Sequence, residues 1–357
     1  MKRPVLHVLL GEGGVGKTTL AAGYALSLAR DGAHVGLLGI DPALRLQSAL
    51  GVGRLTEAGL EVPSGGKLTA ALLRPEDSLR RWAAEQCRDP EVRGRLEANP
   101  FFLALADRLA GTVDALAAIR AAEWAEKDPQ LDHLVVDTAP GLHGLDFLAQ
   151  PDQLLLFLQG RLVRWLRAVA PAGHRGAAGR IGERILHGLS GLSGEGTLSS
   201  LIELFALSGD VVATMAGRLE KARAWLKQPA TERILVCAPR GAGAEGARRM
   251  RGAMNRLGQP PAVVVLNRSL PTTLTPASLR PPPDSPIEAH AFLQFVRGCA
   301  GLQADVLREL ESLGCPVVVL PTAAGLDGPP SERLEALAGL GQQLRAGLPR
   351  HAACFVA

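Results

Sequence analysis

The sequence predicts an α/β protein with a doubly wound, mostly parallel sheet (a P-loop NTPase fold) and a helical insertion. Short, unbroken apolar runs recur along the chain, as is typical of strands buried on both faces. Segments with helical spacing alternate with these runs, which favours parallel strands joined by helices. Between Gly144 and Gln228 the strand pattern disappears and the sequence becomes rich in Leu, Ala and Gly. We therefore assign residues 1–143 and 229–357 to the P-loop domain, and residues 144–228 to a helical insertion.

The individual elements follow from the apolar runs and from their flanking residues. Strands are expected at Val5–Leu10, Val35–Ile40, Leu68–Leu73, Leu134–Asp137, Ile234–Cys237, Ala262–Leu266 and Pro316–Leu320. Helices are expected at Lys17–Arg30, Pro75–Glu85, Thr112–Lys127, Asp210–Lys227, Gly243–Leu257, Glu288–Leu313 and Ser331–Leu344. A Pro-rich loop is expected at Pro271–Pro286.

Composition narrows the class of protein. The chain has 357 residues, 47% of them hydrophobic, enough for a sizeable core. Its net charge of +4 is spread out, so no nucleic-acid partner is expected. The five cysteines include no C-x-x-C pair, which favours a reducing compartment. The first apolar run is too short for a signal peptide, and no run is long enough to span a membrane. The expected location is cytoplasmic.

A glycine-rich loop carries the strongest functional signal. Residues Gly11–Thr18 fit the pattern G-x-x-x-x-G-K-S/T, and they follow a buried strand and open a helix. Glycines let backbone N–H groups curl around phosphate oxygens, and the helix start adds partial positive charge. Lys17 is expected to reach the β and γ phosphates, and the Thr18 hydroxyl to bind Mg²⁺. The sequence therefore predicts a site for ATP with Mg²⁺.

Two acidic residues lie at the carboxyl ends of predicted strands. Asp41 follows the second strand, and Asp137 closes the strand at Leu134–Asp137. Ligands of open parallel sheets gather at the carboxyl ends of the strands, so both carboxylates are expected beside the loop. Asp137 suits support of the hydrated metal, and Asp41 suits orientation of the attacking water. Each could instead be a helix cap or a turn residue.

Four segments resemble the ArsA-type ATPases, which include arsenite-pump ATPases and the ATPases that target tail-anchored membrane proteins. Gly11–Thr19 resembles the deviant phosphate loop of that group. Asp41-Pro42-Ala43 resembles its first switch, and Asp137-Thr138-Ala139-Pro140 its second. Val263–Asn267 resembles the strand and the Asn that contact adenine. Leu320-Pro321 is a weaker match.

The resemblance implies roles for particular residues. It implies that Lys17 and Asp41 act in ATP hydrolysis, and that Thr18 and Asp137 serve Mg²⁺. It implies a nucleotide site formed by Gly11, Gly13, Gly14, Val15, Gly16, Lys17, Thr18, Thr19, Asn267 and Pro321. It also implies a face-to-face dimer, either a homodimer or a heterodimer with a related ATPase. The helical insertion would then shelter a hydrophobic protein client or meet a membrane partner.

Three departures from the family pattern affect these expectations. Glu12 stands where the family loop usually has a Lys that reaches the partner's phosphates. The region from Asn267 to Cys299 has no C-x-x-C for a dimer-bridging zinc. The insertion has a single Met, Met215, so it lacks a Met-rich adaptable surface.

Glu12 has a direct electrostatic consequence. In a face-to-face dimer, the Glu12 carboxylate would lie near the triphosphate bound to the partner. Two like charges about 5 Å apart, at an effective dielectric near 20, repel by roughly 3 kcal/mol. Three arrangements avoid this cost. The chain could pair with a relative that keeps the Lys, an Arg such as Arg240 could bind Glu12, or closure could be weak and turnover slow.

Three functions remain open from the sequence. The first is an ATP-switched carrier of a hydrophobic segment, supported by apolar runs at Leu154–Leu158 and Leu201–Leu207, which could equally pack the insertion's own core. The second is the ATPase subunit of an anion or metalloid exporter. It is disfavoured by the scattered cysteines, since a metalloid favours thiolate ligands. The third is a low-turnover, nucleotide-dependent regulatory subunit, supported by Glu12 alone.

Overall fold

A computed structural model describes residues 3–40, 45–73, 81, 84–85, 89–99, 110–161, 209–239, 243–271 and 286–348. The chain divides into two compact units. The first comprises residues 1–72, 125–145 and 227–357, and the second comprises residues 73–124 and 146–226.

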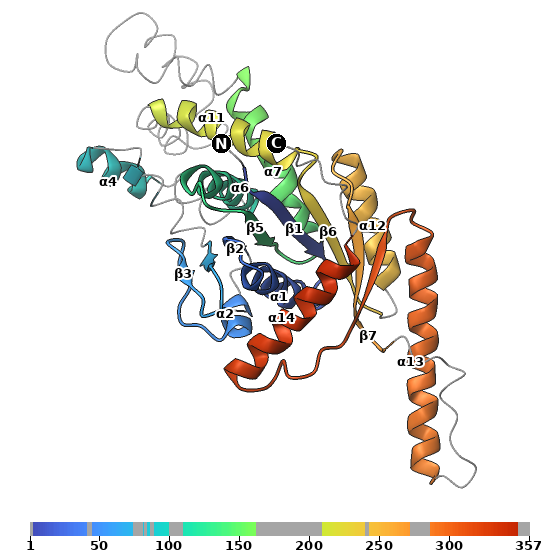
Figure 1. Ribbon diagram of the computed structural model, residues 1–357. Helices are drawn as coiled ribbons and strands as arrows, with labels where there is room; N and C mark the ends of the chain where they lie inside the picture. Colours follow the sequence, from blue (N-terminus) through green and yellow to red (C-terminus); the bar gives the residue numbers. More distant parts are fainter. Residues whose placement is uncertain are drawn as a thin grey trace, which may run out of the picture. The chain divides into compact units, whose positions relative to one another are not determined.

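The first unit is built on one sheet of eight strands (Figure 1). The strand order is β3-β4-β2-β5-β1-β6-β7-β8, and all pairs are parallel except the short edge pair of β3 with β4. The strands are β1 (Val5–Gly11), β2 (Val35–Gly39), β3 (Leu60–Glu61), β4 (Leu68–Leu72), β5 (His133–Asp137), β6 (Glu232–Cys237), β7 (Val263–Ser269) and β8 (Val317–Pro321). The predicted fold class is confirmed.

Strand β1 occupies the centre of the sheet, between β5 and β6. Consecutive residues Val8, Leu9 and Leu10 have no exposed surface, so both faces of the strand are covered. An unbroken apolar run is what such a position requires, because neither face meets water. Parallel pairing brings the carboxyl ends of β1, β2 and β5 to the same edge, with Leu9 and Gly39 each opposite Asp137.

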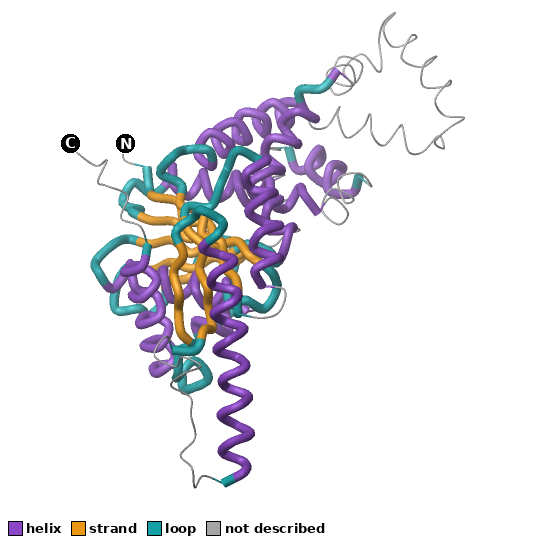
Figure 2. Tube along the Cα trace, turned by 90° about the vertical axis from the view of Figure 1, so that its right-hand side faces the viewer, coloured by secondary structure: helices purple, strands orange, loops and turns teal. Residues whose placement is uncertain are grey.

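Helices cover both faces of this sheet (Figure 1). One face carries α1 (Lys17–Arg30), α2 (Arg45–Leu50) and α14 (Pro330–Gly347). A Cβ on Gly341 would lie 1.9 Å from the Gly23 carbonyl oxygen, so the crossing of α14 over α1 requires glycine. The other face carries α12 (Gly243–Arg256) and α13 (Ile287–Glu311). Figure 2 shows α13 extending well beyond the strands.

The second unit is helical in its described part. It contains α4 (Pro90–Ala98), most of α6 (Ala110–Lys127), α7 (Asp146–Leu158) and α11 (Gly209–Leu226). Helices α7 and α11 pack together, with Gln159 Nε2 donating to Glu220 Oε1 at 3.1 Å. Arg218 of α11 pairs with Glu123 of α6 at 2.9 Å. This unit is wider than the predicted insertion, because it also includes residues 73–124.

The predicted elements and the observed ones agree closely where both are described. Helix α1 begins and ends at the predicted residues, and each predicted strand is present within one or two residues at each end, apart from β7, which runs on to Ser269. The patterns missed α2, α4 and the edge strand β3, all of which are short, and they gave α7 no bounds of its own within the helical insertion. Most of the predicted helix at Pro75–Glu85 and of the Pro-rich loop lies outside the described residues. Among the described helices, none has the length and apolar character needed to cross a membrane.

Candidate functional site

The glycine-rich loop lies between β1 and α1, at the carboxyl edge of the sheet. Gly14 has φ 77° and Gly16 has φ 93°, values in the left-handed region that favours glycine. A Cβ on Gly16 would lie 2.4 Å from Asn267 Nδ2, so close approach also requires glycine there. The loop therefore presents its backbone at the start of α1, where N–H groups and the helix dipole favour an anion.

Lys17 is held against this loop. Its side chain is buried, and its ammonium donates to the carbonyl oxygens of Gly11 at 2.9 Å and Glu12 at 3.0 Å. The cation thus lies within the loop that is expected to surround phosphate. Thr18 and Thr19 are half-buried in the first turn of α1. The predicted roles of these residues toward phosphate and metal stay predictions.

Asp137 lies at the end of β5, the strand that pairs with β1, after which the loop begins. It is buried, and its neighbour Thr138 donates from its hydroxyl to the Leu9 carbonyl oxygen at 2.7 Å. The backbone N–H of Ile40 donates to the Asp137 carbonyl oxygen at 3.0 Å, so the end of β2 lies beside Asp137. Asp41 follows Ile40 directly but lies outside the described residues. The ends of β2 and β5 therefore lie together at the carboxyl edge of the sheet, and the roles of Asp41 and Asp137 stay predictions.

Asn267 and Arg268, near the end of β7, bind the loop from the other side. The buried Asn267 amide donates to the Val15 carbonyl oxygen at 2.8 Å. Arg268 has φ 58° and donates from Nη1 to the Gly14 carbonyl oxygen at 2.8 Å. The predicted contact of Asn267 with adenine stays a prediction. Pro321 ends the neighbouring strand β8, opposite Ser269 of β7.

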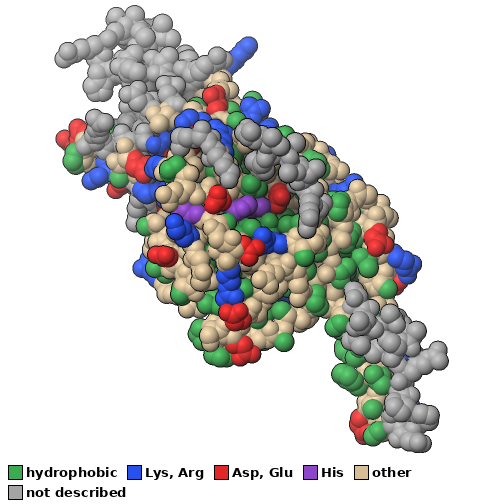
Figure 3. All heavy atoms as spheres, viewed as in Figure 1, with side chains coloured by type: hydrophobic (Ala, Val, Ile, Leu, Met, Phe, Trp, Pro, Cys, Tyr) green, Lys and Arg blue, Asp and Glu red, His purple; other side chains and the backbone are tan. Residues whose placement is uncertain are grey.

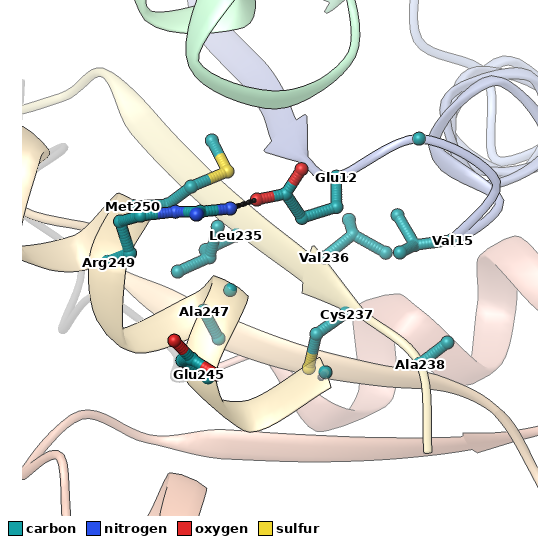
Figure 4. Close-up of a pocket in the computed structure, with 13 residues that line it drawn as sticks. Glu12, Val15, Leu235, Val236, Cys237, Ala238, Glu245, Ala247, Arg249 and Met250 are labelled. Carbon is teal, nitrogen blue, oxygen red and sulfur yellow. Dashed lines mark hydrogen bonds and ion pairs between the residues drawn. The ribbon is translucent and has the colours of Figure 1, made fainter. Parts of the chain in front are cut away.

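Glu12 forms an ion pair with Arg249, a residue that the sequence did not suggest as its partner. Its Oε1 accepts from Nη2 of Arg249 at 2.7 Å, and this bond raises the pKa of the Arg249 guanidinium (Figure 4). The proposed partner, Arg240, lies outside the described residues. A Cβ on Gly246 would lie 3.0 Å from Glu12 Cγ, so α12 approaches the glutamate closely at a position without a side chain.

A cavity of about 370 Å³ opens beside this ion pair. It lies between the loop and the start of α12, and β6 forms its floor (Figure 4). Glu12, Gly13, Glu245 and Arg249 supply its polar side, and Val236 and Met250 belong to its apolar side. Cys237 also lines it, and burial raises the pKa of this thiol to about 12, so the sulfur is a neutral apolar group.

The described residues form no cluster of side chains that could ligate a metal ion on its own. Within those ranges no three His, Cys, Asp or Glu residues come together in a group that could hold a metal ion. Cys237, Cys299 and Cys315 are free thiols. A magnesium ion bound mainly by phosphate and water needs only one or two protein groups, which Thr18 and Asp137 can supply.

The sequence patterns missed Arg249 and Arg268. Neither belongs to a motif with fixed spacing, and each reaches the loop only through the sheet order β1-β6-β7. A weak signal exists for Arg268, which directly follows the Asn that the motif identified. Arg249 has no such signal, since it lies among four arginines of α12 that differ only in the direction in which they point.

The parallel sheet, and the glycine-rich loop between its central strand and α1, define a protein of the P-loop α/β class. Within that class, residues 6–178 match the model of the anion-transporting ATPase family. This match covers just under half of the chain and is a similarity to the ArsA-type ATPases over that part.

Individual relatives show the same similarity over stretches of comparable length. The chain is 34% identical over 144 residues to the ATPase GET3 of Malassezia globosa, covering 40% of this chain and 41% of that protein. It is 32% identical over 141 residues to the arsenical pump-driving ATPase of Escherichia coli, covering 39% of this chain and 22% of that protein. It is 35% identical over 153 residues to an uncharacterized protein of Streptomyces coelicolor, covering 41% and 37%. The matched part thus spans about two fifths or less of each relative.

Proposed function

We propose that this chain binds and hydrolyses ATP with Mg²⁺, and that its nucleotide state controls binding of a hydrophobic protein segment. The observation that carries the first half is the loop between β1 and α1, with the buried Lys17 ammonium bound to the Gly11 and Glu12 carbonyl oxygens. The similar proteins include the ATPase GET3 and an arsenical pump-driving ATPase, which supports the same reaction.

The chain's own residues suit phosphoryl transfer to water. Lys17 can exchange its carbonyl acceptors for phosphate oxygens, which are stronger acceptors because they are charged. Asp41 follows the strand end beside Asp137 and is proposed to orient the attacking water. Thr18 and Asp137 would hold the magnesium ion, which supplies charge neutralisation of the phosphates when it is bound.

The test of this function compares the parent chain with the Asp41→Asn variant. The variant keeps the size and the hydrogen bonding of the side chain but loses the charge that orients water. We expect ATP binding to be retained and hydrolysis to fall by roughly 100-fold. Calorimetry measures the binding, and phosphate release measures the turnover. A parent chain that binds no ATP contradicts the proposal, and equal turnover in both proteins assigns Asp41 a structural role only.

The carrier half of the proposal rests on the second unit. Leu156 and Phe157 of α7 are 71% and 56% exposed, so two adjacent large apolar side chains are accessible to a client. An ATP-controlled carrier must bind its client differently in its two states. We therefore expect hydrogen exchange of α7 and α11 to change when ATP is added. Identical exchange with and without nucleotide contradicts the carrier.

A second candidate is the ATPase of an anion exporter, which the family's description and the arsenical-pump relative favour. Arsenite or antimonite should then stimulate ATP turnover, because the transported anion must favour the active state. No stimulation by either anion leaves the carrier as the better proposal. The low-turnover regulatory subunit remains a third candidate, and a steady-state ATPase assay decides it.

We also propose that the chain acts as a dimer, either with itself or with a related ATPase. The Arg249 pairing supports the second of the three arrangements considered for Glu12, because it neutralises the carboxylate within the same chain. Light scattering with and without ATP measures the assembly of the purified chain. A chain that stays monomeric with ATP excludes the homodimer and leaves the heterodimer.

A further inference from the structure

Arg249 and Lys17 hold the same short part of the loop from two sides. The Lys17 ammonium donates to the Gly11 and Glu12 carbonyl oxygens, and the Arg249 guanidinium binds the Glu12 carboxylate. Phosphate loops of this type place their lysine against the terminal phosphates. Glu12 and Gly13 therefore lie on the side of the loop nearest to those phosphates, and Arg249 is one ion pair away from them.

The cavity beside the ion pair suits an anion better than its acidic residues alone suggest. Its wall includes Gly243 and Gly246 in the first turn of α12, where backbone N–H groups and the helix dipole favour negative charge. It also includes Gly13 of the loop itself. Figure 4 shows the Arg249 side chain reaching from α12 toward Glu12 at this cavity. The side chain of Arg249 is 59% exposed, so its guanidinium is accessible to a ligand.

A triphosphate at the loop changes the balance of this ion pair. Its charge repels the Glu12 carboxylate and attracts the Arg249 guanidinium, whose planar fork binds phosphate oxygens in a bidentate way. A diphosphate places less charge on this side of the loop, because it lacks the terminal group. The Glu12–Arg249 ion pair is therefore stable beside a diphosphate, whereas a triphosphate weakens it.

We propose that Arg249 binds the terminal phosphate, and that Glu12 holds its guanidinium in place until a triphosphate arrives. Arg249 is then a cation supplied by the same chain that distinguishes ATP from ADP. This inference rests on the proposed nucleotide binding and adds the residue that recognises the third phosphate. The competing interpretation is a static link, in which the pair only fastens the loop to α12 and affects both nucleotides equally.

The experiment uses calorimetry on the full chain to measure its affinities for ATP, for a non-hydrolysable ATP analogue and for ADP. The variants are Arg249→Ala, Arg249→Lys and Glu12→Gln. The matched control is Arg248→Ala, which removes the neighbouring arginine that pairs with Glu309 at 2.9 Å. Thermal denaturation checks that each variant is folded.

We expect Arg249→Ala to weaken binding of ATP and its analogue by about tenfold or more, with ADP affinity changed by less than about twofold. Arg249→Lys should recover part of the loss, since it keeps the charge but not the fork. Glu12→Gln should tighten ATP binding, because it removes the competing carboxylate. Arg248→Ala should bind both nucleotides as the parent does.

The outcomes separate this inference from the proposed function. If the parent binds neither nucleotide, the proposed function fails first. If the parent binds ATP but Arg249→Ala keeps the parent's ratio of ATP to ADP affinity, the inference is wrong and the pair is a static link. Weaker binding of both nucleotides to the same extent leads to the same conclusion.

Discussion

Each end of β1 carries a pair of hydrogen-bonded side chains, and the two pairs have nearly equal lengths but different surroundings. At the carboxyl end, Glu12 and Arg249 approach to 2.7 Å, and their side chains are 35% and 59% exposed. At the amino end, His7 Nδ1 and Glu232 Oε2 approach to 2.8 Å, and their side chains are 3% and 21% exposed. Distance alone therefore does not indicate what each pair does.

The amino-end pair belongs to a buried polar cluster. His7 Nε2 lies 3.0 Å from His133 Nδ1, and the Tyr24 hydroxyl lies 3.3 Å from His7 Nδ1. Burial, together with a smaller contribution from the nearby His7, lowers the pKa of His133 to about 4. Burial and the neighbouring Glu232 raise the pKa of Tyr24 above its usual range. At the surface of the unit, Figure 3 shows histidine side chains on the face in view with acidic side chains close by.

Burial makes the amino end a structural feature and leaves the carboxyl end available for ligands. Buried hydrogen-bonded groups contribute strongly to stability, because when one partner is removed, no water replaces it and the other group stays unsatisfied. An exposed ion pair contributes little to stability because water and salt screen it. The comparison therefore predicts that changes at the carboxyl end alter nucleotide binding, whereas changes at the amino end alter stability.

Lys17→Ala should have the largest effect at the carboxyl end. It removes the main cation of the loop and should weaken ATP binding by at least about tenfold, about 1.4 kcal/mol or more. Calorimetry measures the affinity. Lys67→Ala is the control, because it removes an exposed lysine next to the start of β4. Unchanged ATP affinity in Lys17→Ala would overturn the assignment of the phosphate loop.

His7→Ala should lower the free energy of unfolding by about 2 kcal/mol, since it leaves a cavity and removes hydrogen-bond partners of Glu232 and His133. ATP affinity should stay within about twofold of the parent's. Chemical denaturation followed by circular dichroism measures the first effect. His290→Ala removes an exposed histidine of α13 and should change neither property. Loss of ATP binding in a folded His7→Ala protein contradicts the division of roles between the two ends.

Acid should destabilise the fold through His133. Its pKa is about 4 in the folded chain and about 6.5 when unfolded, so the unfolded chain binds the proton first as the pH falls. The contribution of neutral His133 is complete above pH 6.5 and is lost progressively down to pH 4. We expect a loss of about 1 to 2 kcal/mol over that window. In His133→Gln this slope should be smaller. An unchanged slope assigns the acid sensitivity to other groups.

Glu12→Gln should have the smallest effect on stability, although the Glu12–Arg249 contact is about as short as the His7–Glu232 contact. The midpoint of denaturation should agree with the parent's within error, because both side chains of the pair are well exposed. Screening of this ion pair by high salt should likewise leave the parent's midpoint of denaturation unchanged. A marked loss of stability in Glu12→Gln would show that the pair fastens the loop structurally and would sharpen the case for a static link.

The sequence by itself determined the elements and the motif. The unbroken apolar run of β1 specifies a central strand, and the glycines and Lys17 specify the loop that follows it, because local patterns depend on neighbours within a few residues. For the same reason Asp137 was placed at a strand end beside the loop. The short elements α2, α4 and β3 were not predicted, because they have too few residues to show a hydrophobic period.

The tertiary structure decided which distant side chains meet. His7, His133 and Glu232 come from three strands, and only the parallel register that aligns them makes a cluster. Arg249 was one of four arginines on α12, and only its direction from the helix toward Glu12 distinguishes it. Pairing register and helix rotation depend on the packing of the whole unit, so local spacing carries no information about these contacts.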